Sequence, residues 1–86
     1  MLKDIIGREV KVGDILAWSS TYSGISVNVV IKILPKTVRV DSGDLVYTQC
    51  SMIVNEQLTT TPAGENLRYE LTEKNKDRFD YTSPKR

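Results

Sequence analysis

The stretch that decides the fold is VIKILPKTVRV, residues 30–40, in which two β-branched apolar runs meet at a proline. Pro35 cannot donate a hydrogen bond to a neighbouring strand, so it ends the first run and opens a tight turn at Pro35-Lys36. In the second run Val38 and Val40 alternate with polar residues, which is the period of a half-buried strand. The stretch therefore predicts a β-hairpin with basic residues on its solvent side.

The strand that enters this hairpin, VNVVIKIL at residues 27–34, has one uniformly β-branched face. That face consists of Val27, Val29, Ile31 and Ile33. Because β-branched side chains pack well on a pleated surface, we predict that it forms the core face. The opposite face, with Val30 and Lys32, is expected to point away from the core.

Further strand patterns flank the hairpin. Residues 15–20, ILAWSS, are apolar on both faces, which predicts a strand covered on both sides and leaves open whether Trp18 is buried. Residues 8–12 alternate weakly and predict another strand, followed by a Gly13-Asp14 turn. After a turn at residues 41–44, residues 45–55 predict a longer strand, bent around 49–51.

The C-terminal third is harder to assign. Residues 55–66 are polar without periodicity and predict a loop. Residues 67–71, LRYEL, alternate as a strand does, although Leu67, Leu71 and Phe79 would also share one helical face. We predict a strand at 67–71 and a helical turn within 73–79. A barrel domain would then span residues 1–72, and residues 73–86 would form the helical turn and a loose tail.

The order of these elements resembles that of the SH3-like small barrels, a group that includes KOW and Tudor modules. The resemblance rests on VKVGDILAW and VVIKILPKTVRV and covers residues 8–54. It implies a mostly-β fold, an antiparallel barrel of about five strands with a short C-terminal helical turn. The opening GREVKVGD also resembles that of accessory proteins of tailed bacteriophages. This second resemblance implies expression in the infected bacterial cytoplasm and a role in modifying host machinery.

The composition argues against catalysis. The 86 residues contain no histidine, which removes Ser-His and Cys-His pairs and the common zinc sites. The close acid pairs, Asp41 with Asp44 and Glu70 with Glu73, have ordinary turn and surface patterns. Phosphate-binding glycine motifs are absent from the sequence. We therefore expect a binding module that is not an enzyme, with no catalytic residue, metal or cofactor.

The single cysteine and the apolar runs bear on location. Cys50 lies in a strand-like run, so we expect a buried structural thiol, and one cysteine cannot form an internal disulfide. No apolar run approaches the length of a membrane span, and the N-terminus is charged, unlike a secretory signal. A cytoplasmic protein without membrane contact is expected.

The first binding hypothesis is nucleic acid. Lys32, Lys36 and Arg39 lie on or near the solvent side of the hairpin, and Lys11 and Arg8 are candidates to extend this strip. Such cations neutralise phosphates, and exposed aromatic residues beside them stack on bases. The aromatic candidates are Trp18, Tyr22 and Tyr47. The net charge of +1 supplies no overall attraction, so a local patch would have to carry the binding.

The second hypothesis is a protein partner. Tyr22 and Ile25 lie in the loop TYSGIS, where exposed aromatic and apolar side chains can anchor an interface. Tyr69 and Phe79, among the charges of the C-terminal region, are further candidates. The partner would be a host or defence protein, and a second copy of the chain is another candidate.

Overall fold

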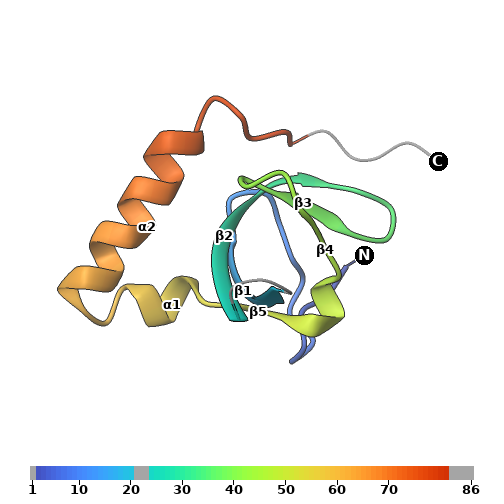
Figure 1. Ribbon diagram of the computed structural model, residues 1–86, viewed down its shortest axis with the longest axis horizontal. Helices are drawn as coiled ribbons and strands as arrows, with labels where there is room; N and C mark the ends of the chain where they lie inside the picture. Colours follow the sequence, from blue (N-terminus) through green and yellow to red (C-terminus); the bar gives the residue numbers. More distant parts are fainter. Residues whose placement is uncertain (1, 21–23, 82–86) are drawn as a thin grey trace.

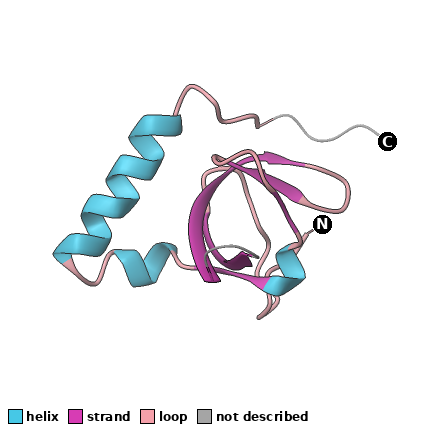
Figure 2. Ribbon diagram, in the orientation of Figure 1, coloured by secondary structure: helices cyan, strands magenta, loops and turns pink. Residues whose placement is uncertain are grey.

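The computed structural model describes residues 2–20 and 24–81, and within them a curled antiparallel sheet carries two helices on one side (Figures 1 and 2). The sheet has the order β4-β3-β2-β1-β5. Its strands are β1 (Ile15–Ser20), β2 (Gly24–Ile33), β3 (Val38–Val40), β4 (Leu45–Val46) and β5 (Ser51–Ile53). A 3₁₀ helix, η1 (Thr48–Cys50), joins β4 to β5. The expected mostly-β fold is confirmed: five antiparallel strands form a curled half-barrel, consistent with a small SH3-like barrel.

The central hairpin forms as predicted. β2 pairs with β3 through Val30↔Val40 and Ile33↔Val38, and the Leu34 amide donates to the Thr37 carbonyl (2.8 Å) across the Pro35-Lys36 turn. Val38 and Val40 are fully buried. The next turn also forms, with Gly43 at φ 92° and its amide donating to the Val40 carbonyl (2.9 Å). Only a residue without Cβ adopts that φ readily, so glycine is the natural residue there.

Both faces of β1 are covered, as its apolar sequence predicted. Leu16 belongs to a cluster inside the barrel, and Ile15 belongs to a second cluster outside the sheet. The inner cluster is Val10, Leu16, Val30, Val38, Val40, Val46 and Ile53. The outer cluster is Ile15, Val29, Ile31 and Val54, with Leu58, Leu71 and Phe79 packed against it. The protein therefore has two small cores separated by the sheet.

This arrangement corrects the prediction for β2. Val29 and Ile31 pack in the outer cluster, but Val30, from the face expected to point away from the core, packs inside the barrel. A bulge between Val30 and Lys32 then reverses the alternation, so that Ile33 packs against the inner cluster. The prediction of a single core face was wrong because the helices cover the second face.

Two other strand predictions were wrong. Residues 8–12 form no named strand; Glu9 makes only an isolated bridge with Lys3, although Val10 is buried in the inner cluster. The longer strand expected over 45–55 is divided into β4 and β5 by η1. Cys50, at the end of η1, is exposed and not buried as expected, because the 3₁₀ turn directs it away from both cores.

The C-terminal region is helical. α1 spans Asn55–Leu58 and α2 spans Pro62–Asn75. The strand predicted at 67–71 was therefore wrong. The helix is also much longer than the single turn predicted within 73–79. α2 continues without a break across residues 72 and 73, where the barrel domain was predicted to end. The Thr61 side chain accepts a hydrogen bond from the Gly64 amide (3.0 Å), and Pro62 occupies the first helical position. A threonine cap followed by proline is a standard helix start, and this signal was present in the sequence.

No helix in the described residues is long and apolar enough to cross a membrane.

Candidate nucleic-acid interface

Three exposed side chains form a row across β2, β3 and β4. Lys32 pairs directly with Arg39, and Arg39 pairs directly with Leu45. Directly opposed residues in an antiparallel sheet point to the same face, here the outer one, because Val38 and Val40 beside Arg39 point inward. The Lys32 side chain is 45% exposed and Leu45 is 52% exposed. We call Lys32, Arg39 and Leu45 the transverse row.

Two further exposed residues border this row. Lys36 lies in the turn between β2 and β3 and is exposed. Tyr47 follows β4, two residues after Leu45, with extended backbone (φ −78°, ψ 115°) and 59% of its surface exposed. Side chains two apart on extended backbone share a face. Tyr47 therefore extends the face that carries Leu45, and in Figure 1 β2 lies between α2 and β4.

The charge of the row is partly compensated. The Lys32 Nζ lies 3.6 Å from Oδ2 of Asp80, which also forms a parallel β-bridge with Lys32. The Arg39 Nη1 donates to the Gly43 carbonyl (3.4 Å), a contact that leaves its charge unneutralised. Among residues 2–20 and 24–81, no carboxylate forms an ion pair with Lys36 or Arg39, and Lys32 is paired with Asp80.

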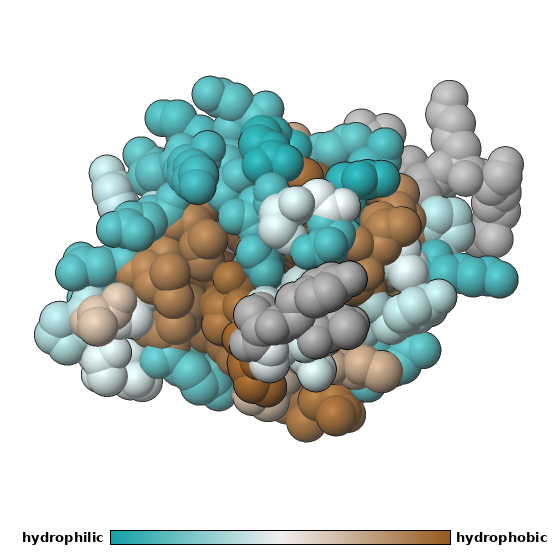
Figure 3. Space-filling model, in the orientation of Figure 1, coloured by the Kyte–Doolittle hydropathy of each residue, from teal (hydrophilic) through white to brown (hydrophobic). Residues whose placement is uncertain are grey.

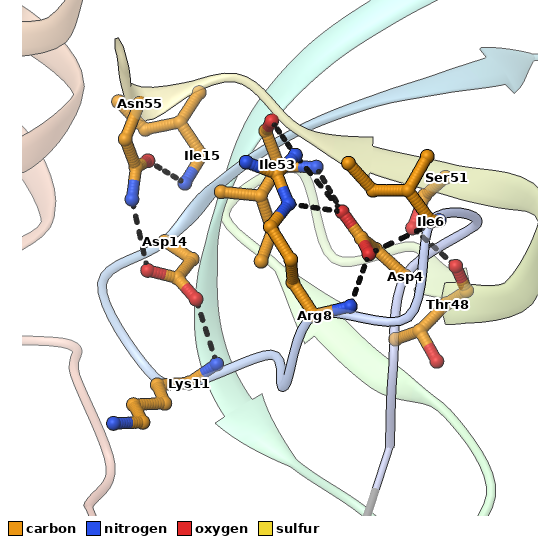
Figure 4. Close-up of polar contacts among 10 residues, drawn as sticks. All are labelled: Asp4, Ile6, Arg8, Lys11, Asp14, Ile15, Thr48, Ser51, Ile53 and Asn55. Carbon is orange, nitrogen blue, oxygen red and sulfur yellow. Dashed lines mark hydrogen bonds and ion pairs between the residues drawn. The ribbon is translucent and has the colours of Figure 1, made fainter.

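Arg8 is not part of this face. Its guanidinium binds the buried Asp4 carboxylate (Nη2–Oδ2 3.0 Å, Nε–Oδ2 3.1 Å) and donates to the Ile53 carbonyl (Figure 4). Ile53 is in β5, at the other end of the strand order from β4. Arg8 therefore ties the N-terminal loop to β5 and is not positioned to extend the hairpin strip.

Asp4 organises that loop. Burial raises the pKa of its carboxyl group, but hydrogen bonds from the Ile53 and Arg8 amides and the Arg8 guanidinium outweigh burial and lower the pKa below 3.8. The distances are 3.0 Å to the Ile53 amide and 2.8 Å to the Arg8 amide. The Asp4 carboxylate is therefore a fully bonded structural anion, which sequence patterns alone did not reveal.

Lys11 precedes β1 in a separate turn. Its amide donates to the Asp14 carboxylate (2.8 Å), which also accepts from the Asn55 side chain (3.0 Å). Figure 4 shows the Lys11 ammonium pointing away from Arg8. Of the five predicted basic residues, the pairing of β2 with β3 brings together Lys32, Lys36 and Arg39.

The aromatic candidates separate in the structure. Trp18 is half-buried against the inner cluster, and its indole donates to the Asn28 side chain (3.0 Å). Tyr22 lies outside the described residues. Of the aromatic candidates that lie among the described residues, Tyr47 is the one on the face of the basic hairpin.

The residues of the protein-binding hypothesis are spread over several elements. Ile25, at the start of β2, is 74% exposed, and Tyr69, on α2, is 66% exposed. Phe79 is half-buried against the outer cluster and meets Tyr81 edge to face, with ring centroids 6.1 Å apart. Among residues 2–20 and 24–81, no group of three or more His, Cys, Asp or Glu could hold a metal ion.

Comparison with known proteins places the chain in a family. No curated protein and no solved structure matches it. One family model matches residues 2–60, which include the whole sheet and α1 and end just before α2. The chain therefore belongs to the family described as Domain of unknown function (DUF7205).

Proposed function

We propose that this protein acts by binding and not by catalysis, and that its ligand is nucleic acid held on the outer face of the β2–β3–β4 sheet. The observation that carries the proposal is the transverse row with Lys36 beside it. Arg39 and Lys36 supply cations for phosphates, and strand pairing fixes the position of the Arg39 backbone before any ligand arrives. The setting that the sequence resemblance implies, a phage-encoded protein in the bacterial cytoplasm, offers both DNA and RNA as ligands.

The test is binding of a fluorescently labelled oligonucleotide followed by anisotropy. The triple variant Lys32→Glu, Lys36→Glu and Arg39→Glu reverses the charge of the face. We expect it to abolish binding, and we expect the wild-type affinity to fall with salt with a log–log slope of about 2 for single strands and 3 for a duplex.

A matched triple variant distinguishes the effect of this face on binding from the effect of net charge. Arg68→Glu, Lys74→Glu and Lys76→Glu change the total charge by the same amount at exposed positions on or next to α2. We expect this variant to retain most of the binding. Equal losses in both triple variants, or no binding by the wild-type protein, would refute the proposal.

A second candidate function is binding of a host protein. Ile25 is 74% exposed, and Ile5 and Ile6 are 62% and 63% exposed. Figure 3 shows a brown apolar cluster at the lower edge of the molecule, over the N-terminal loop. Exposed isoleucines can anchor a protein interface.

Capture from bacterial lysate, with nuclease and high salt, distinguishes the two candidates. A defined host protein that remains bound under those conditions and is lost on Ile25→Ser would favour the second candidate. Loss of all captured protein after nuclease would favour the first.

A further inference from the structure

The proposed face is as apolar as it is basic. Leu45 and Tyr47 are both more than half exposed. Leu45 pairs with Arg39, and Tyr47, two residues further along extended backbone, is on the same side of the sheet as Leu45. Exposed apolar side chains are unfavourable in water unless a ligand covers them. A ligand that offers flat apolar surface as well as phosphate would therefore match this face better than phosphate alone.

The number of cations limits what electrostatics can do. Lys32, Lys36 and Arg39 form three phosphate contacts at most, and Lys32 already faces Asp80 at 3.6 Å. The whole chain carries a net charge of only +1. Proteins that hold duplex DNA by its backbone use about six to ten such contacts. This face therefore has too few cations to bind a duplex tightly by charge alone.

Base faces are the apolar surface that a nucleic acid can offer. In a duplex each base is stacked on its neighbours, and proteins reach only base edges through the grooves. In a single strand the faces are free to stack on an aromatic ring, and such stacking tolerates any sequence. Tyr47, with 59% of its surface exposed, has room to accept a base.

We propose that the ligand is single-stranded nucleic acid, with a base stacked on Tyr47 beside Leu45 and adjacent phosphates held by Arg39 and Lys36. This inference rests on the proposed function and specifies the form of its ligand. The shared chemistry of DNA and RNA single strands, unpaired bases on a phosphate backbone, is what the face recognises.

The first test uses the wild-type protein with four labelled probes of about twelve nucleotides. The probes are single-stranded DNA, single-stranded RNA, an abasic DNA strand with the same number of phosphates, and a DNA duplex. We expect one or both single strands to bind about tenfold more tightly than the abasic strand and the duplex. Equal binding of the abasic strand, or equal or tighter binding of the duplex, would overturn the inference and leave the proposed function standing. Binding to none of the probes would overturn both.

The second test changes the ring. Tyr47→Ala should weaken single-strand binding about tenfold without changing the salt slope, and Tyr47→Phe should preserve binding because the ring remains. Tyr69→Ala removes a similarly exposed tyrosine from α2 and should leave the affinity within about twofold. Unchanged melting temperatures would show that the variants are folded. Wild-type affinity of Tyr47→Ala would refute the stacking role.

Discussion

Lys32 of β2 and Asp80 near the C-terminus form both a parallel β-bridge and an ion pair, with 3.6 Å between Nζ and Oδ2. The Asp80 amide also donates to the Ile31 carbonyl (2.6 Å), so backbone pairing holds the carboxylate beside the lysine. Both side chains are more than one-third exposed, and such pairs add little to folding stability. Under the proposed function the contact would matter for binding, because Asp80 occupies a position where a phosphate would meet Lys32.

Asp80→Asn should therefore strengthen nucleic-acid binding. The variant keeps the backbone pairing and removes the anion that competes with phosphate, so we expect affinity to rise about two- to fivefold at low salt. Asp77→Asn, an exposed neighbour, makes the same change in net charge. Anisotropy titrations of both variants decide the point. Equal increases would show that net charge, and not the Lys32–Asp80 contact, is responsible.

Asp4→Asn should destabilise the fold. The substitution leaves the partly buried Arg8 guanidinium without its counterion and removes an acceptor from the Ile53 amide. Losing hydrogen bonds to a charged group costs about 1.5–3 kcal/mol, so we expect a loss of that order in the free energy of unfolding. Urea unfolding measures it. A loss below about 0.5 kcal/mol, as is usual for surface positions, would contradict the structural role.

The same carboxylate should make stability depend on pH. Its pKa is lower in the folded protein than the ordinary 3.8, so the unfolded chain takes up the proton first as pH falls. The contribution of the ionised Asp4 carboxylate to folding stability is complete above about pH 5. It is lost as pH falls through 3.8 toward the pKa of the folded protein. Unfolding measured from neutral pH to below 3.8 should show a flatter acid limb in Asp4→Asn than in wild type. Identical limbs would exclude Asp4 as the source.

Gly64→Ala should lower stability, although alanine is normally the better helix residue by about 1 kcal/mol. A Cβ at this position would lie 2.9 Å from the Leu58 Cα and closer still to the Leu58 carbonyl oxygen. We expect a net loss of about 1–3 kcal/mol because α2 has to move away from α1. Asn66→Ala, exposed on the same helix, should be neutral or slightly stabilising. Thermal unfolding compares them, and a higher melting temperature for Gly64→Ala would contradict the close packing.

Asn75 should be the polar residue that fixes α2 to the barrel. It is fully buried, and its side-chain amide donates to the Leu71 carbonyl (2.8 Å) and to the Asp41 carboxylate (3.3 Å). Asn75→Ala removes the hydrogen bond that joins α2 to the Asp41 carboxylate, a charged acceptor, which costs about 1–3 kcal/mol. Lys74→Ala, an exposed neighbour, is the control for helix content. Hydrogen exchange in α2 should accelerate in Asn75→Ala alone; equal protection in both variants would contradict this role.

Local chemistry in the sequence predicted the parts of the fold that depend on neighbouring residues. Pro35 ends β2 because it lacks an amide hydrogen, and this holds in any tertiary environment. The valines at alternate positions of β3 point inward because successive side chains of a strand point to opposite faces. The Thr61-Pro62 helix start is equally local, because a capping side chain and a proline at the first helical position act on adjacent backbone. The alternation of LRYEL suggested a strand, whereas in the structure Tyr69 is exposed and only Leu71 of α2 packs against the outer cluster.

The candidate site also has a part that the local sequence predicted and a part that only the tertiary structure decided. The hairpin sequence by itself brought Lys32, Lys36 and Arg39 together, because a short turn sets the register of two adjacent strands. Only the tertiary structure decided that Arg8 serves a buried carboxylate, that Leu45 and Tyr47 complete the outer face, and that Asp80 neutralises Lys32. The contacts of Asp4 and Arg8 with Ile53, and of Lys32 with Asp80, join residues far apart in the chain. Their geometry is set by how the sheet curls and bulges and by which surfaces the helices cover.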